Sequence, residues 1–277
     1  MGNKNNYGAV IPTDTGNATN IKLCVPDTPE DDEAVQIHQL GVERLKKADI
    51  INARELYLKA IEMGNVDAIM SLAHLYMGVK MYKEAEGYYL QASVNGNSHA
   101  YNNLGAISLL LYKNSEKAEK YFLLACEHGN YAAYENLAYI CVNSKVPDFD
   151  KAEQYYLLAI EKGDIKQINA YFNLATFYHV YVKNDIKAEE YYLKSVEHGK
   201  YQNGMVFFNL AKLYQGKKKD LAIYYFSIGW HNIKDERIRV VCFDEIKKIL
   251  PPEQINNVMK IMYDHHTQFI NGRKSLC

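Results

Sequence analysis

The chain has 277 residues and a formal net charge of −1, because 32 lysines and arginines face 33 aspartates and glutamates. This balance argues against a nucleic-acid-binding surface, which normally carries a large basic excess. Apolar residues make up 48% of the chain, too many for a wholly disordered protein. We therefore expect a folded chain with no nucleic-acid partner.

Residues 1–33 are expected to form an arm without a helical period. Glycines and prolines punctuate this stretch, and the acidic run 30–33 leads into the first helix, where acidic side chains face the positive end of the helix dipole. Gly2 raises the question of N-myristoylation, but Asn6 stands where that motif needs serine or threonine. The sequence leaves open whether Gly2 is lipidated, and whether the arm is disordered or docks in a groove of its own chain.

A pattern with a period of 32 to 36 residues follows the arm. A glycine closes each period and follows an alanine by eleven residues. An aromatic residue and a second small residue lie four and seven positions after that alanine, which places all three on one face of a helix. In chain order these residues are Ala53, Tyr57, Ala60, Gly64; Ala85, Tyr89, Ala92, Gly96; Ala118, Phe122, Ala125, Gly129; Ala152, Tyr156, Ala159, Gly163; and Ala188, Tyr192, Ser195, Gly199.

Another helix is expected upstream of each of these helices. It carries a small residue directly after a leucine and a larger apolar residue three positions before that leucine, which again gives one helical face. A sixth second helix continues through Ala222, Phe226 and Gly229. The sequence thus predicts six helix pairs over residues 34–234. The leucines of the first helices are Leu40, Leu72, Leu104, Leu137, Leu174 and Leu210.

The residue types explain why these pairs must stack. Small residues let two helices approach closely, and aromatic residues, including many of the 24 tyrosines, fill the grooves beside them. Each closing glycine is expected to supply a left-handed C-cap at which the chain reverses. One pair cannot bury its apolar face alone. We therefore predict an all-α fold, an α-solenoid of about six antiparallel helix pairs.

Residues 235–277 depart from the period. We expect one helix over Glu236–Leu250, a stop at Pro251, and a last helix over Glu253–Phe269 that Pro252 can begin. These C-terminal helices are expected to cap the exposed end of the stack. The alternative is that they form the interface of a homo-oligomer, or of a regulatory subunit in a larger complex.

The second helices resemble those of Sel1-like repeats, which are relatives of tetratricopeptide repeats. In residues 117–125, 151–159 and 187–195 a Lys-Ala start is followed by paired aromatic residues and a small residue, and the closing glycines also fit Sel1-like repeats. The usual Gly-x-Gly-Val loop inside a pair is represented only by Gly78, Val79 and Gly216. The resemblance covers roughly 200 residues. It implies a solenoid that binds other proteins as a scaffold or adaptor.

In those families the first helices line the concave face, where a ligand binds. The residue before each leucine would then face the ligand, and four of these residues are Asn103, Asn136, Asn173 and Asn209. An asparagine amide both donates and accepts hydrogen bonds, so this ladder is expected to hold the backbone of an extended peptide. The alternative is that the amides cap or bridge neighbouring helices.

The flanking columns are expected to set the preference of that face. They contain Glu135, Tyr139, Phe172, Phe208 and Lys212. Because Lys212 is the only base in these columns, we do not expect a clamp for a C-terminal carboxylate, and apolar or aromatic peptide anchors fit better. The alternative for Phe172 and Phe208 is packing against neighbouring repeats.

The sequence offers no motif for catalysis or metal binding. It has no Gly-rich phosphate loop, no H-E-x-x-H and no G-x-S-x-G. The one local cluster, Asp264-His265-His266, places its histidines about 100° apart around a helix, which does not make a chelating pair. We therefore predict no enzyme activity, no cofactor and no metal; an unrecognised enzyme is the second alternative.

The compartment is expected to be the cytoplasm. The five cysteines are odd in number and form no C-x-x-C pair, which favours free thiols in a reducing environment. No apolar stretch approaches the roughly 18 residues of a transmembrane helix. The sequence therefore predicts a cytoplasmic protein-interaction scaffold whose partner it does not identify.

Overall fold

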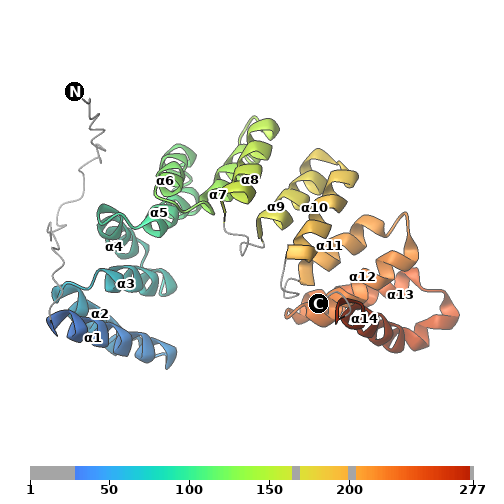
Figure 1. Ribbon diagram of the computed structural model, residues 1–277, viewed down its shortest axis with the longest axis horizontal. Helices are drawn as coiled ribbons and strands as arrows, with labels where there is room; N and C mark the ends of the chain where they lie inside the picture. Colours follow the sequence, from blue (N-terminus) through green and yellow to red (C-terminus); the bar gives the residue numbers. More distant parts are fainter. Residues whose placement is uncertain (1–28, 164–168, 199–203, 275–277) are drawn as a thin grey trace. The chain divides into compact units, whose positions relative to one another are not determined.

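A computed structural model of the chain describes residues 29–163, 169–198 and 204–274. The arm up to residue 28, including Gly2, lies outside the described residues, as does Gly199. In the described ranges the structure consists of fourteen α-helices and two short helices of other types, without strands. The predicted all-α solenoid of consecutive helix pairs is confirmed (Figure 1).

The chain divides into two compact units, Met1–Tyr121 and Phe122–Cys277. Unit 1 contains α1 (Pro29–Lys46), α2 (Ile50–Glu62), α3 (Val66–Gly78), α4 (Tyr82–Val94) and α5 (Ser98–Leu110), and the unit boundary falls within α6 (Ser115–Glu127). Unit 2 contains α7 (Ala133–Val142), α8 (Phe149–Lys162), α9 (Asn169–Phe177), the π-helix η1 (Tyr178–Val182), α10 (Asp185–His198), α11 (Gly204–Tyr214), α12 (Lys219–Asn232), α13 (Glu236–Ile249), the 3-10 helix η2 (Pro252–Asn257) and α14 (Val258–Lys274).

The repeating face of the second helices forms the core, as predicted. The alanines of this face are all buried, and so are its aromatic residues. Small residues on the first helices make room for these rings: a Cβ added to Gly41 would lie 2.7 Å from Cε1 of Tyr57. The repeated leucine of the first helices is buried in the later pairs, but Leu40 on α1 is exposed, because no earlier helix pair among the described residues covers α1. The buried aromatic residues are Tyr57, Tyr89, Phe122, Tyr156 and Tyr192.

Gly-Asn dipeptides separate successive pairs in unit 1. Gly64 and Gly96 have φ of 93° and 77°, the left-handed conformation that ends a helix at no steric cost. The following asparagines then begin the next helix: Oδ1 of Asn65 accepts the backbone N–H of Ala68 at 2.9 Å, and Asn97 makes the same bond to residue 100.

The prediction of a left-handed cap was wrong for one glycine. In unit 2, Gly129 has a φ of 89°, whereas Gly163 has φ −68° and ψ 154°. Gly163 is therefore in extended backbone that any residue adopts, and it ends α8 without reversing the chain by a left-handed turn.

The turns inside the pairs also take the left-handed conformation, but at residues other than glycine. Lys80, Lys113 and Lys183 have φ between 54° and 64°, and Ala48 has φ 59°. No glycine stands at these positions in the sequence, so the left-handed conformation was not predicted there. A lysine held there costs about 1 kcal/mol relative to glycine.

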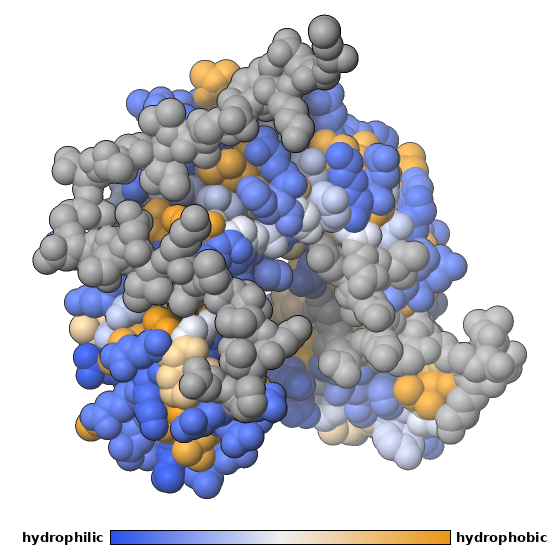
Figure 2. Space-filling view, turned by 60° about the vertical axis from the view of Figure 1, so that its left-hand side comes forward, coloured by the Kyte–Doolittle hydropathy of each residue, from blue (hydrophilic) through white to orange (hydrophobic). Residues whose placement is uncertain are grey.

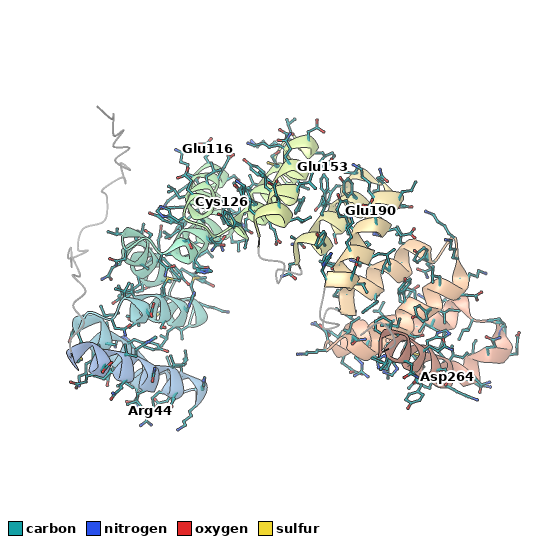
Figure 3. All side chains as sticks on the ribbon, in the orientation of Figure 1. Arg44, Glu116, Cys126, Glu153, Glu190 and Asp264 are labelled. Atoms are coloured by element: carbon teal, nitrogen blue, oxygen red, sulfur yellow. The ribbon has the colours of Figure 1, made fainter. Side chains whose placement is uncertain are left out.

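Tyrosines at the ends of the first helices connect successive repeats. The hydroxyl of Tyr178 donates to the carboxylate of Glu153, which lies on α8 of the preceding pair. Nζ of Lys187 donates to the same carboxylate at 3.2 Å. Glu153 is labelled in Figure 3. Unit 1 has the same arrangement, in which Tyr112 donates to Glu86 at 2.6 Å and Lys117 donates at 3.1 Å. These triads stabilise the stacking of one pair on the next.

The C-terminal helices pack against the last pair. Cys242 and Ile246 of α13 and Met262 of α14 share a buried cluster with Phe226 of α12. The expected first helix ends at Ile249, close to the prediction, but the second begins differently: Pro252 starts the 3-10 helix η2, and α-helix follows only from Val258. At the other end of the chain, α1 begins at Pro29, before the residue 34 that we expected.

No described helix is both long enough and apolar enough to cross a membrane. On the face shown in Figure 2, the described residues are mainly hydrophilic, and the hydrophobic ones lie in separate small patches.

Candidate functional site

The candidate residues of unit 2 come from its three first helices, α7, α9 and α11. We call the surface made by these residues the first-helix surface of unit 2. All of them are half-buried except Tyr139, whose exposed fraction is 49%. Asn103 lies on α5 of unit 1 and is treated separately. The first-helix surface comprises Glu135, Asn136, Tyr139, Phe172, Asn173, Phe208, Asn209 and Lys212.

Glu135, Tyr139 and Asn173 come together on this surface. Nδ2 of Asn173 donates to Oε2 of Glu135 at 2.7 Å, which joins α9 to α7. Glu135 and Tyr139 are four residues apart on α7, so their side chains lie on the same face of that helix. Burial raises the pKa of the Glu135 carboxyl, and the bond from Asn173 partly offsets this effect. The result is a carboxylate that has lost part of its hydration beside an accessible aromatic ring.

Two other asparagines also contact neighbouring helices. Nδ2 of Asn103 lies 3.3 Å from Nε2 of His74 on the preceding first helix, and Asn209 hydrogen-bonds to the hydroxyl of Tyr192. The bridging that we left open as an alternative is therefore present at Asn103, Asn173 and Asn209. Each amide has three hydrogen-bonding groups, so one such bond does not exhaust its capacity.

The two phenylalanines pack against second helices. Phe172 lies 6.0 Å from Tyr192, and Phe208 lies 5.7 Å from Phe226, measured between ring centroids. Both belong to the partly buried shells of the hydrophobic clusters. Their rings are thus partly buried beneath the first-helix surface, and Tyr139 is the exposed aromatic residue of that surface.

Lys212 forms an ion pair with α13, the first of the C-terminal helices. Its Nζ lies 3.4 Å from Oε2 of Glu245 on α13 and donates to Gln215 at 3.2 Å. The hydrogen bonds of Lys248 and Gln215, together with the charge of Lys212, lower the pKa of Glu245 to about 2. Glu245 thus neutralises the single base of the flanking columns. The apolar period does not predict this pair, because it does not show which face of α13 meets α11.

The histidines of the C-terminal helices form a stacked pair. The rings of His231 on α12 and His266 on α14 are 4.1 Å apart and inclined by 20°. Burial lowers the pKa of both, and His266 lowers that of His231 further. The lone pairs of stacked rings lie side by side and do not converge on an ion. Within the described ranges, no three histidine, cysteine, aspartate or glutamate side chains form a group that could hold a metal ion.

A family model for the Sel1 repeat matches the chain four times. The matched residues are 34–65, 98–130, 132–164 and 168–200. These segments begin near the starts of first helices and end near the closing glycines, so the family's repeat coincides with the helix pairs described above. A comparison with curated proteins finds no match.

Solved structures of repeat proteins share the fold. A Sel1 repeat protein from Oxalobacter formigenes is 21% identical, with a TM-score of 0.56 over 82% of this chain and 96% of its own. A tetratricopeptide repeat protein from Parabacteroides merdae is 16% identical, with a TM-score of 0.55 over 82% of this chain and 87% of its own. The protective antigen c5321 of uropathogenic Escherichia coli, which displays the same class of fold, is 18% identical, with a TM-score of 0.53 over 84% of this chain and 60% of its own.

Proposed function

Because four segments of the chain match the Sel1 repeat and form helix pairs, we propose that it is a non-enzymatic scaffold or adaptor that binds an extended segment of another protein on the first-helix surface of unit 2. Sel1 and tetratricopeptide repeats are generally scaffolds for protein interactions and are generally non-catalytic. The observation that carries the proposal is the group of Glu135, Tyr139 and Asn173, which places a charge, an aromatic ring and an amide together on first helices.

The same group indicates the chemistry of the bound segment. Glu135 has lost part of its hydration but forms no ion pair among the described residues. A lysine or arginine of the partner would supply the missing cation, and its alkyl or guanidinium part would pack on the ring of Tyr139. The remaining amide groups of Asn136, Asn173 and Asn209 would hold the peptide backbone. We thus propose a basic segment held in extended form.

A peptide selection tests this proposal. Full-length protein is used to select binders from a displayed library of random peptides, and affinities are measured by fluorescence anisotropy. We expect enrichment of lysine and arginine, and a loss of about tenfold in affinity for Glu135→Gln, since an ion pair with a partly buried carboxylate is removed.

Glu190→Gln is the matched control for this measurement. Glu190 lies on the second helix α10, is exposed, and pairs with Lys194 at 2.7 Å (Figure 3). Its replacement should leave the affinity unchanged. The proposal fails if no peptide is selected, or if the selected peptides bind Glu135→Gln as tightly as the wild type.

Self-association through the C-terminal helices is the second candidate function. Val240 on α13 and Tyr263 on α14 are half-exposed or more, although both helices pack on α12. If this face joins two copies, light scattering will show an oligomer that Val240→Asp/Tyr263→Asp converts to a monomer. A monomer for the wild type at all concentrations would instead leave these helices as a cap.

We also propose the cytoplasm as the compartment. The three described cysteines, Cys126, Cys141 and Cys242, are buried and form no disulfide bond. Burial raises the pKa of the Cys126 thiol to about 11 and that of Cys242 to about 12, so both are unreactive thiols. Thiol titration of the unfolded protein, purified without reductant, should find these three thiols reduced.

A further inference from the structure

The turns inside the helix pairs of unit 2 expose large apolar side chains. Val146, in the turn between α7 and α8, is 84% exposed, and Ile186, at the start of α10, is 82% exposed. They are the two most exposed of the large hydrophobic residues that the structure describes. We call this surface the turn edge of unit 2; its apolar residues are Val146, Phe149, Val180, Tyr181, Val182 and Ile186.

Contacts between neighbouring turns join them into one edge. The ring of Phe149 lies 6.4 Å from that of Tyr181, which connects the α7–α8 turn to the π-helix η1. Nζ of Lys217, in the turn between α11 and α12, lies 2.6 Å from Asp185 at the start of α10. Three successive turns are therefore adjacent, in line with the packing of α8 against α9 (Figure 1).

The edge is positively charged although the chain as a whole is not. Residues 145–150, 180–187 and 214–220 contain six lysines and four aspartates, a net charge of 6 − 4 = +2, against −1 for the whole chain. Lys145 stands next to Val146, and Lys183 stands between Val182 and Ile186. Lys183, Lys218 and Lys219 are exposed. Lysines therefore lie beside the protruding apolar residues and on the adjacent α11–α12 turn.

We propose that the turn edge of unit 2 binds the surface of an anionic lipid bilayer. Exposed valine, isoleucine and aromatic side chains gain free energy when they enter the interface between headgroups and acyl chains. Lysines beside them attract anionic headgroups and reach the headgroup layer with their flexible stems. The edge presents exposed apolar residues on the first two of these turns and exposed lysines on all three.

The form of the edge favours a membrane over a protein partner. Protein partners usually anchor their central residues in well-packed pockets. On the turn edge the two most exposed side chains instead protrude from a turn, at Val146, and from the start of α10, at Ile186, and such a side chain can enter a lipid layer without a matching cavity. Lys183 also stands at the tip of its turn, in the left-handed conformation with φ 60°.

Co-sedimentation of the full-length protein with vesicles tests this inference. We expect binding to vesicles of phosphatidylcholine mixed with phosphatidylserine, weaker binding to phosphatidylcholine alone, and a decrease with added salt. Val146→Asp/Ile186→Asp should lower the partition coefficient at least about tenfold. Lys145→Ser/Lys218→Ser/Lys219→Ser should lower it on the order of a hundredfold for the mixed vesicles only.

Val94→Asp is the matched control, since Val94 is 70% exposed but ends α4 of unit 1, away from any turn inside a pair. It should bind mixed vesicles like the wild type, and circular dichroism should show that every variant is folded. The inference is overturned if the wild type does not bind mixed vesicles, or if Val146→Asp/Ile186→Asp binds them equally well. Self-association that this double variant abolishes, without vesicle binding, would overturn it in favour of a protein interface.

Discussion

Glycines at different places in the helices differ in what surrounds them. A Cβ added to Gly204, the first residue of α11, would lie 2.4 Å from Cγ1 and 2.7 Å from the backbone nitrogen of Ile233. Gly87, inside α4, has nothing within 4 Å of such an atom. Gly204 is therefore required by close packing, whereas Gly87 only weakens its helix.

Alanine substitution should separate the two cases. We expect Gly204→Ala to lower the free energy of unfolding by about 2 kcal/mol, because backbone must shift to admit the methyl group. Gly87→Ala should raise it by about 0.5–1 kcal/mol, because alanine is the better helix former. Urea unfolding followed by circular dichroism measures both, and a Gly204→Ala variant at least as stable as the wild type would contradict the close packing at Gly204.

Glu245 should make stability depend on pH in the acid range. Its folded pKa is lowered to about 2 from an ordinary value of 4.5, so its contribution is present above pH 4.5 and is lost as the pH falls towards 2. Glu245→Gln is expected to lower the free energy of unfolding by about 2 kcal/mol at neutral pH and to have no effect near pH 2.

The fluorescence of Trp230, the only tryptophan, reports this unfolding, because its ring packs against Arg239 of α13 at 4.4 Å. The exposed Glu253 on η2 provides the control Glu253→Gln, which should change little at any pH. A difference between wild type and Glu245→Gln that stays constant from neutral to acid pH would rule out the linkage.

At the scale of elements, the triads of tyrosine, glutamate and lysine differ in exposure. Tyr178 is fully buried, and its hydroxyl binds Glu153 and lies 3.0 Å from Nζ of Lys187. Tyr112 makes the equivalent bond to Glu86 but is exposed. The same set of groups should therefore contribute more to stability around Tyr178 than around Tyr112.

Phenylalanine substitution measures this difference. We expect Tyr178→Phe to lower the free energy of unfolding by about 1–2 kcal/mol, because a partly buried carboxylate loses a donor. Tyr112→Phe, the matched variant, should cost less than about 1 kcal/mol, because water replaces the lost bond. Equal costs in chemical denaturation would show that the triad does not hold the pairs together.

The elements that could be predicted are those that burial defines. The buried aromatic residues from Tyr57 to Tyr192 could be predicted from the sequence, because the second helix of each pair must have one apolar face and this pattern repeats along the chain. The left-handed turns inside the pairs could not be predicted in this way. A sequence indicates such a turn by a glycine, whereas Lys183 takes the left-handed conformation without one. The π-helix after α9 likewise has no signal in the apolar period.

At the scale of the whole molecule, the period explains why the fold was predictable and the site only partly so. Stacking repeats the same contacts, so a spacing in the sequence translates into a solenoid. The contacts that shape the candidate site depend on the register between helices that are far apart in the chain. The bond of Asn173 to Glu135 and that of Lys212 to Glu245 span 38 and 33 residues, and the apolar period carries no information about either.

The central claim is that the first-helix surface of unit 2 holds the backbone of an extended segment, and the affinity of selected peptides for Asn136→Ala/Asn173→Ala/Asn209→Ala tests it most directly. Since the amides would bind backbone, we predict a loss of at least about tenfold for every selected peptide, whatever its sequence, with helical content retained. A folded triple variant that binds all of these peptides as tightly as the wild type would contradict the account.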